Sequence, residues 1–189
     1  MGGVTTLPIS LGAESEGISF DGARIWTANF GASVSIVTLS PFVSVNTVTA
    51  GFTHPNGILY DGANMWVTDQ FADRLLKLDS NGIIIQFVIV GNSPQFPVFD
   101  GTNIWVVTDS DSVTVVRAST GAVLANLTGN GLDGPITAAF DGERILVTNQ
   151  QGTSVSLWKA ADLSPLGSVS TGDENNADLT SRPGNILSA

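Results

Sequence analysis

The chain has 189 residues, with seven Lys and Arg against seventeen Asp and Glu and a formal net charge of −10 at pH 7. A hydrophobic content of 42% with only 13% charged residues predicts a folded chain with a buried core and excludes an intrinsically disordered one. The acidic balance argues against nucleic acid as a partner. The absence of cysteine excludes disulfides and thiol catalysis, and a single histidine excludes any site that needs two imidazoles.

The N-terminal region lacks the basic segment and long apolar stretch of a signal peptide, and instead residues 4–11 are expected to form a strand. The longest apolar run, residues 83–90, is too short for a membrane helix. The sequence therefore predicts no membrane association. It leaves the compartment open, since cytoplasmic and extracellular locations both fit.

An internal repeat organises the chain. Asp-Gly pairs begin at positions 21, 61, 100 and 141, so the spacing is 40, 39 and 41 residues. An aromatic residue precedes each pair, and an Ile-Trp or Met-Trp sequence follows three of them, with Leu146 in the fourth. This spacing defines units at about residues 12–51, 52–91, 92–131 and 132–172 of a single domain. Residues 173–189 are expected to form an acidic linker and a terminal strand.

Each repeat unit is expected to form four short strands. A β-rich run leads into the Asp-Gly pair, which marks a tight hairpin turn, and the Trp-containing run forms the second strand. The repeated Trp26, Trp66 and Trp105 are expected in the core between blades, whereas Trp158, in a third strand, is expected nearer the rim. The expected third strands are 34–39, 74–78, 113–117 and 155–159, and the expected fourth strands are 43–49, 83–90, 122–127 and 166–170. Four strands in about 40 residues is typical of a β-propeller blade. The predicted fold is an all-β propeller with four complete blades of four antiparallel strands and partial strands at both termini.

Several of these segments resemble known repeats. Trp26-Thr27-Ala28-Asn29, Trp66-Val67-Thr68-Asp69 and Leu146-Val147-Thr148-Asn149, with Ser-Val-Ser at 33–35 and 154–156, resemble YVTN-type β-propeller repeats. That group is related to NHL-repeat and virginiamycin B lyase-like propellers. The resemblance covers about residues 12–172. It implies the propeller fold, but it is compatible with binding surfaces, surface-layer modules and occasional enzymes.

The propeller plan places two kinds of loop on one face, those before the first strand and those between the second and third strands. Functional residues are concentrated in loops on a rigid scaffold, so this loop face is the predicted site for a protein or a small ligand. The Asp-Gly turns fall on the opposite face. The predicted ligand-face residues are Asn29, His54, Asn56, Asp69, Asp73, Asp109, Asp111 and Asn149.

Two interpretations are open for the residues that end the second strands, Asn29, Asp69, Asp109 and Asn149. Their side chains can shape the following loop as Asx-type turns. Alternatively, they can supply oxygen ligands near the propeller axis, with Asp69 and Asp109 as metal candidates for Ca²⁺ or Mg²⁺ bound in the millimolar range. No cofactor is firmly implied.

Catalysis has few candidates. His54 could act as a general base if Glu14, Glu16, Asp69 or Asp73 approached it. The resemblance to virginiamycin B lyase-like enzymes implies a metal with His and Glu residues, but this chain has one His and four Glu, too few for most of that set.

We therefore expect a non-enzymatic binding or assembly module that presents an acidic loop face. The alternatives are a metal-dependent lyase- or hydrolase-like enzyme and a structural piece of a larger surface or particle assembly. The two ends of the repeat are out of phase with the blade, and unpaired strand edges need a partner. We expect the terminal strands to pair within one chain or to form a homodimer.

Overall fold

The structure is a computed structural model that describes residue 7 and residues 9–172. The described residues form sixteen strands and a single-turn 3₁₀ helix, η1 (Gln70–Ala72). Half of the expected N-terminal strand and all of the expected C-terminal strand lie outside the described residues. Residues 7 and 9–11 are not in a strand. No helix in the described part of the chain is long and apolar enough to cross a bilayer.

The strands form four separate four-stranded antiparallel sheets, each made of consecutive strands. The first blade contains β1 (Ser15–Phe20), β2 (Arg24–Asn29), β3 (Ser33–Thr38) and β4 (Ser44–Val48). The second contains β5 (Pro55–Tyr60), β6 (Met65–Asp69), β7 (Arg74–Leu78) and β8 (Ile84–Ile89). The third contains β9 (Pro94–Phe99), β10 (Asn103–Thr108), β11 (Ser112–Arg117) and β12 (Val123–Thr128). The fourth contains β13 (Pro135–Phe140), β14 (Arg144–Asn149), β15 (Ser154–Lys159) and β16 (Pro165–Ser170).

These sheets confirm the predicted fold class. The Asp-Gly turns join the first and second strand of every blade, and the turn glycine always has a positive φ, from 93° at Gly101 to 102° at Gly142. Glycine adopts this conformation without a steric penalty, which explains why the pair recurs. The third and fourth strands lie within two residues of their expected bounds.

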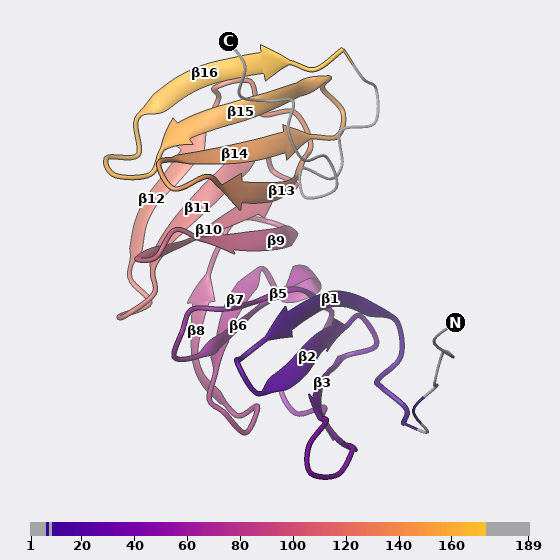
Figure 1. Cartoon of the computed structure of the whole chain (residues 1–189). Coiled ribbons are helices and arrows are strands. Elements are labelled where there is room, and N and C mark those ends of the chain that lie inside the picture. The colour runs from indigo at the N-terminus through magenta and orange to yellow at the C-terminus, as the bar shows by residue number, and fades with distance from the viewer. Residues whose placement is uncertain (1–6, 8, 173–189) are drawn as a thin grey trace, which may run out of the picture.

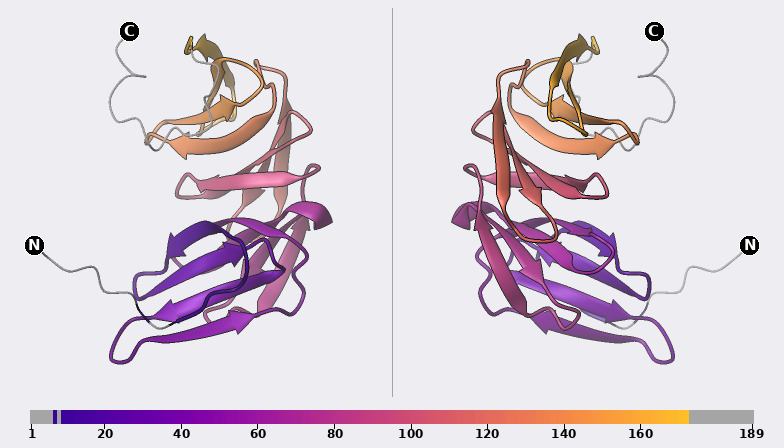
Figure 2. Two further views of the ribbon diagram at one scale, coloured as in Figure 1. Left: turned by 90° about the vertical axis from the view of Figure 1, so that its right-hand side faces the viewer. Right: turned by 90° about the vertical axis from the view of Figure 1, so that its left-hand side faces the viewer.

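The blades are arranged side by side along an arc (Figure 1). The first strands β1, β5, β9 and β13 lie next to one another in chain order, and two perpendicular views show the same succession (Figure 2). Figure 1 shows an open arc, with the first blade at one end and the fourth at the other. Among the described residues, no sheet combines strands from two blades.

The core lies between adjacent blades. Three apolar clusters fill the three blade-to-blade interfaces, and the repeated tryptophans Trp26, Trp66 and Trp105 each belong to a different one. All three are almost fully buried, as the repeat predicted. Burying such side chains removes a large apolar area from water and is the main stabilising contribution to these interfaces.

Trp158 departs from expectation. The sequence reading placed this third-strand residue near the rim, where it would be less buried, but its exposed fraction is 1%. Trp158 pairs with Ile145 across β14 and β15 and packs in the cluster that contains Trp105. The third strand is therefore as much a part of the interface as the second.

Candidate functional site

On the predicted loop face, the two asparagines that end second strands are buried hydrogen-bonding centres. Asn29 Oδ1 accepts hydrogen bonds from the hydroxyls of Ser15 and Thr27, while its Nδ2 donates to Ser33 and Ser35. Asn149 follows the same plan, since its Nδ2 donates to the hydroxyls of Ser154 and Ser156 and its Oδ1 accepts the Asp133 backbone N–H. Both amides hold the loop that begins after their strand.

Asp69 occupies the corresponding position in the second blade and is also fully buried. Its carboxylate accepts the backbone N–H groups of Thr53 and His54 at 3.0 and 2.7 Å. Arg74 Nη2 lies 3.1 Å from Asp69 Oδ2 and forms an ion pair with it. Three donors from the protein itself therefore neutralise and satisfy this carboxylate.

The remaining acidic residues of this face connect one blade to the next. Asp73 accepts the Ser93 backbone N–H, and Asp111 accepts the Gly134 backbone N–H, each at 2.8 Å. Both aspartates have a left-handed backbone, with φ near 50°, a conformation that Asp tolerates better than most residues.

A chain of side-chain hydrogen bonds links the second blade to the third. Asn56 donates to Gln95 Oε1 at 2.9 Å, and Gln95 Nε2 donates to Asp109 Oδ1 at 2.8 Å. Ser93 Oγ donates to the second oxygen of Asp109. The contacts of Asn29, Asp69, Asp109 and Asn149 are those of loop-shaping residues.

The structure does not bring the metal candidates together. Asp69 and Asp109 belong to different blades, and each carboxylate is engaged by its own neighbours. Within residues 7 and 9–172, there is no group of three or more His, Cys, Asp or Glu side chains placed to hold one ion.

His54 lies in an aromatic cluster. Its ring centroid is 4.6 Å from that of Phe30 and 4.0 Å from that of Phe71. Its Nδ1 atom is shielded and has no hydrogen-bond partner in the described part of the chain. Glu14 and Glu16 are exposed on the first blade, and no ion pair in the described region joins either to the imidazole. In the described structure, His54, Glu14 and Glu16 are not assembled into one hydrogen-bonded group.

The opposite face carries a repeated motif that the sequence reading missed. In the first three blades one carboxylate oxygen of the turn aspartate caps the turn, and the other accepts the indole N–H of the tryptophan five residues later. The indole bonds are all 2.7 Å and join Asp21 to Trp26, Asp61 to Trp66 and Asp100 to Trp105. In the fourth blade, where Leu146 replaces tryptophan, Asp141 instead forms an ion pair with Arg144 at 2.8 Å. The recurring Asp-Gly-x-x-x-Trp spacing in the sequence could have predicted this hydrogen bond.

Two of these turn carboxyls have lowered pKa values. Burial opposes the ionisation of Asp21, but hydrogen bonds from the Trp26 indole, the Arg24 and Ala23 backbone and the Arg24 side chain outweigh it and hold the pKa below its ordinary value. Burial likewise opposes the ionisation of Asp141. Hydrogen bonds from Arg144 and Glu143, with the positive charge of Arg144, lower the pKa.

Two grooves open on this turn face, each between adjacent blades. The groove between the second and third blades has a volume of about 460 Å³, and the one between the third and fourth blades about 370 Å³. The larger groove is lined by residues that include Asp61, Asn64, Lys77, Phe99, Arg117 and Ser119. The smaller groove is lined by residues that include Asp100, Asn103, Arg117, Phe140, Glu143 and Ala160. Arg117 lines both.

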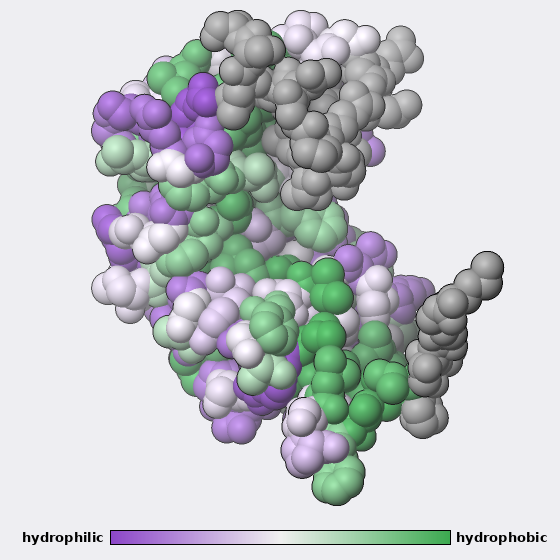
Figure 3. All heavy atoms as spheres, in the orientation of Figure 1, coloured by the Kyte–Doolittle hydropathy of each residue, from purple (hydrophilic) through white to green (hydrophobic). Residues whose placement is uncertain are grey.

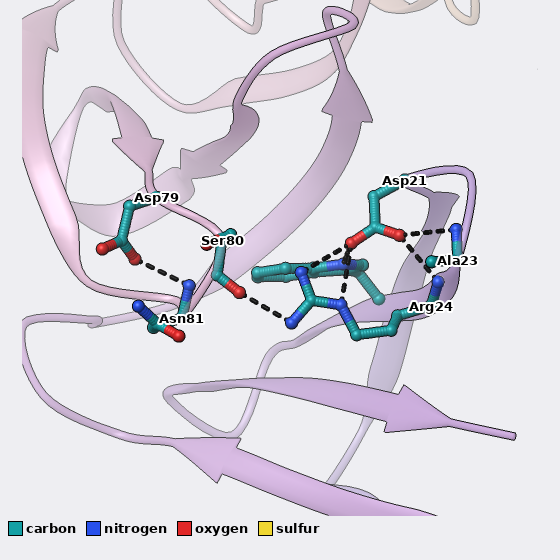
Figure 4. A network of polar contacts seen from close by, with 7 residues as sticks. Asp21, Ala23, Arg24, Asp79, Ser80 and Asn81 are labelled. Atoms are coloured by element: carbon teal, nitrogen blue, oxygen red, sulfur yellow. Dashed lines mark hydrogen bonds and ion pairs between the residues drawn. The ribbon is translucent and has the colours of Figure 1, made fainter. Parts of the chain in front are cut away.

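The interface between the first two blades carries a longer side chain at the corresponding position. There, Arg24 follows the turn, pairs with Asp21 at 2.8 Å and donates to the Ser80 carbonyl of the second blade at 2.7 Å (Figure 4). Its guanidinium also lies 5.2 Å from the Trp26 ring centroid. Asn64 and Asn103 occupy the same position in the next two blades and are too short to reach across. A groove is present at each of these asparagines.

Comparison with known proteins supports the fold but identifies no family or function. No family model matches the chain, and no curated protein matches its sequence. Among solved structures, the chain is similar to hydrazine synthase from Kuenenia stuttgartiensis, with a TM-score of 0.73 and 18% sequence identity. The match covers 89% of this chain and 53% of that one, so this chain spans about half the length of the protein it matches.

Proposed function

We propose that the chain is a non-enzymatic binding module on a YVTN-like propeller scaffold, and that its ligand binds in the turn-face grooves beside Arg117. The main support for this proposal is the position of the Arg117 side chain and its lack of a partner among the described residues. Arg117 lines both grooves. Among the described residues, its guanidinium takes part in no ion pair and no hydrogen bond.

The surroundings of Arg117 favour a carboxylate ligand. A guanidinium is planar and matches the two oxygens of a carboxylate or phosphate. Asp100 and Glu143 also line the smaller groove, and the chain carries a net charge of −10. A singly charged carboxylate is repelled less by these groups than a doubly charged phosphate.

The other lining residues suit a small polar molecule. Phe140 supplies an apolar wall, and Asn103 supplies an amide whose Nδ2 donates to Asp100 while its Oδ1 has no partner in the described region. This unpartnered oxygen is the acceptor that a ligand hydroxyl or amine would need. A volume of about 370 Å³ lies at the small end of the usual range for ligand sites. A hydroxy or amino carboxylic acid fits this description.

The experiment is a thermal-shift and calorimetric screen with lactate, glucuronate and glycine, against glucose and inorganic phosphate. A ligand that binds only the folded state raises its stability by mass action. We expect a carboxylate to raise the melting temperature of the parent and of Lys159→Gln, a control for loss of one positive charge, but not of Arg117→Gln. The proposal would be contradicted if the melting temperature of Arg117→Gln rose as much as that of the parent. It would also be contradicted if no carboxylate raised the melting temperature of the parent.

The loop face is a second candidate, for a protein partner. Phe71 is 62% exposed there, beside the half-buried Phe30 and His54. Exposed aromatic side chains of this kind are common at the centres of protein interfaces. Capture of a partner by the parent but not by Phe71→Ala would favour this face over the grooves.

A further inference from the structure

The groove between the second and third blades contains a second cation besides Arg117. Lys77 lines this groove, and only 9% of its surface is exposed. Its ammonium donates a hydrogen bond to the Ala118 carbonyl at 2.9 Å and lies 5.0 Å from the Trp66 ring centroid. None of the ion pairs among the described residues includes Lys77. An ammonium has three N–H donors, so Lys77 can still donate to a molecule in the groove.

The repeat shows that this position does not need a charge to fold. Lys77 pairs with Trp66 across β6 and β7. In the other three blades, the residue at the equivalent position of the third strand is apolar and buried, namely Ile36, Val115 and Leu157. A buried ammonium without a carboxylate partner costs free energy, and an apolar side chain at the same place does not. A residue that departs in this way from its repeat is typical of a functional site.

The two turn-face grooves differ in formal charge. Besides Arg117, the charged residues that line the smaller groove are Asp100 and Glu143, so one cation and two carboxylates give a net charge of −1. Those that line the larger groove are Lys77 and Asp61, so two cations and one carboxylate give a net charge of +1. Both oxygens of Asp61 already accept hydrogen bonds, from the backbone of its own turn and from an indole. The larger groove is therefore the better site for a ligand with two negative charges.

We propose that the larger groove binds a dicarboxylic acid, with one carboxylate at the Arg117 guanidinium and the other at the Lys77 ammonium. This inference rests on the proposed function, because it requires that Arg117 holds a carboxylate. Lys77 lies on β7 of the second blade and Arg117 ends β11 of the third, so each blade that forms the groove supplies one cation. Two carboxylates joined by a short chain match two separate cations better than the single centre of a phosphate does.

The other lining residues suit the chain between the two carboxylates. Phe99 provides an apolar wall for methylene groups, and Thr102 and Ser119 provide hydroxyls for a polar substituent. A volume of about 460 Å³ lies within the usual range for ligand sites. Figure 3 shows hydrophilic side chains along the edge of the array that holds the Asp-Gly turns, on the left in this view, whereas apolar side chains gather over the first blade.

Titration calorimetry with succinate and with succinamate, its monoamide, isolates the second charge, because the two acids have nearly the same shape. A hydrogen bond between charged groups is stronger than one to a neutral group by enough to change affinity about tenfold. We expect the parent to bind succinate about tenfold more tightly than succinamate, and Lys77→Met to reduce this preference to less than about twofold. Methionine fills the site of a lysine stem at a position that is apolar in the other blades. The control Lys159→Gln removes a positive charge outside the groove and should keep the preference.

The outcomes separate this inference from the proposed function. Equal affinities of the parent for succinate and succinamate would overturn the dicarboxylate site, and so would a succinate preference that persists in Lys77→Met. Inorganic phosphate that bound the parent more tightly than succinate would also overturn it. In the first two cases the proposed function would stand if both acids bound the parent and neither bound Arg117→Gln. If neither acid bound the parent, the carboxylate site at Arg117 would itself be refuted, and this inference with it.

Discussion

Replacing Trp66 by alanine tests the central role given to the blade interfaces. The indole is fully buried among apolar residues of the second and third blades. Emptying such a site costs about 3–5 kcal/mol of unfolding free energy. The change also removes the 2.7 Å hydrogen bond to Asp61 and the contact with the Lys77 ammonium, which lies 5.0 Å from the ring centroid. These contacts place the expected cost at the upper end of the range.

A urea titration followed by circular dichroism measures this cost. With a slope of about 2 kcal/mol per molar urea, the midpoint should fall by about 2.5 M. Trp66→Phe keeps most of the ring but loses the indole N–H, so it should cost about 1–2 kcal/mol. Phe71→Ala, at an exposed aromatic, is the control and should change stability by less than about 0.5 kcal/mol. A loss below about 1 kcal/mol for Trp66→Ala would show that the interface does not depend on this side chain.

Three further predictions concern single residues. Trp158→Ala should cost about as much as Trp66→Ala in the same titration, because it empties an equally buried site; a change of less than about 1 kcal/mol would contradict its burial. Arg24→Asn should lower stability by about 1 kcal/mol, since the arginine is partly exposed, and should open a third groove visible in a crystal structure; an unaltered surface there would refute our account of the grooves. Because the pKa of folded Asp21 lies below the ordinary 3.8, its contribution is complete above about pH 4 and is lost as pH falls through the lowered value. Asp21→Asn should therefore weaken the acid dependence of stability, and an unchanged pH profile would count against the hydrogen bonds assigned to it.

The fold could be predicted because local sequence patterns determine it. The Asp-Gly spacing and the β-branched runs beside the repeated tryptophans fix a hairpin and a buried strand at each position, and this is repeated four times. Trp158 was misplaced because the sequence of one strand does not reveal which of its faces meets a neighbouring blade. Only the pairing with Ile145 and the packing against the third blade show that.

The site was harder to predict, for a physical reason. Acidic residues in loops look available in a sequence, but buried backbone N–H groups need acceptors, and Asp69 serves two of them. The two grooves lie instead where Asn64 and Asn103 stand at the position of the longer Arg24. A sequence pattern identifies charged residues that are present. It does not identify a position where a long charged side chain is missing.

The construction of every sheet from four consecutive strands has a consequence for how such a chain can change. Over residues 9–172, each hydrogen-bonded ladder is closed within one stretch of about 40 residues, so removal or duplication of a whole unit breaks none of these ladders. What the new neighbours must supply is a matching apolar face and partners for the hydrogen bonds that join adjacent blades. Gene duplication can therefore lengthen the array one blade at a time, with the cost or gain in stability concentrated at the single junction created each time.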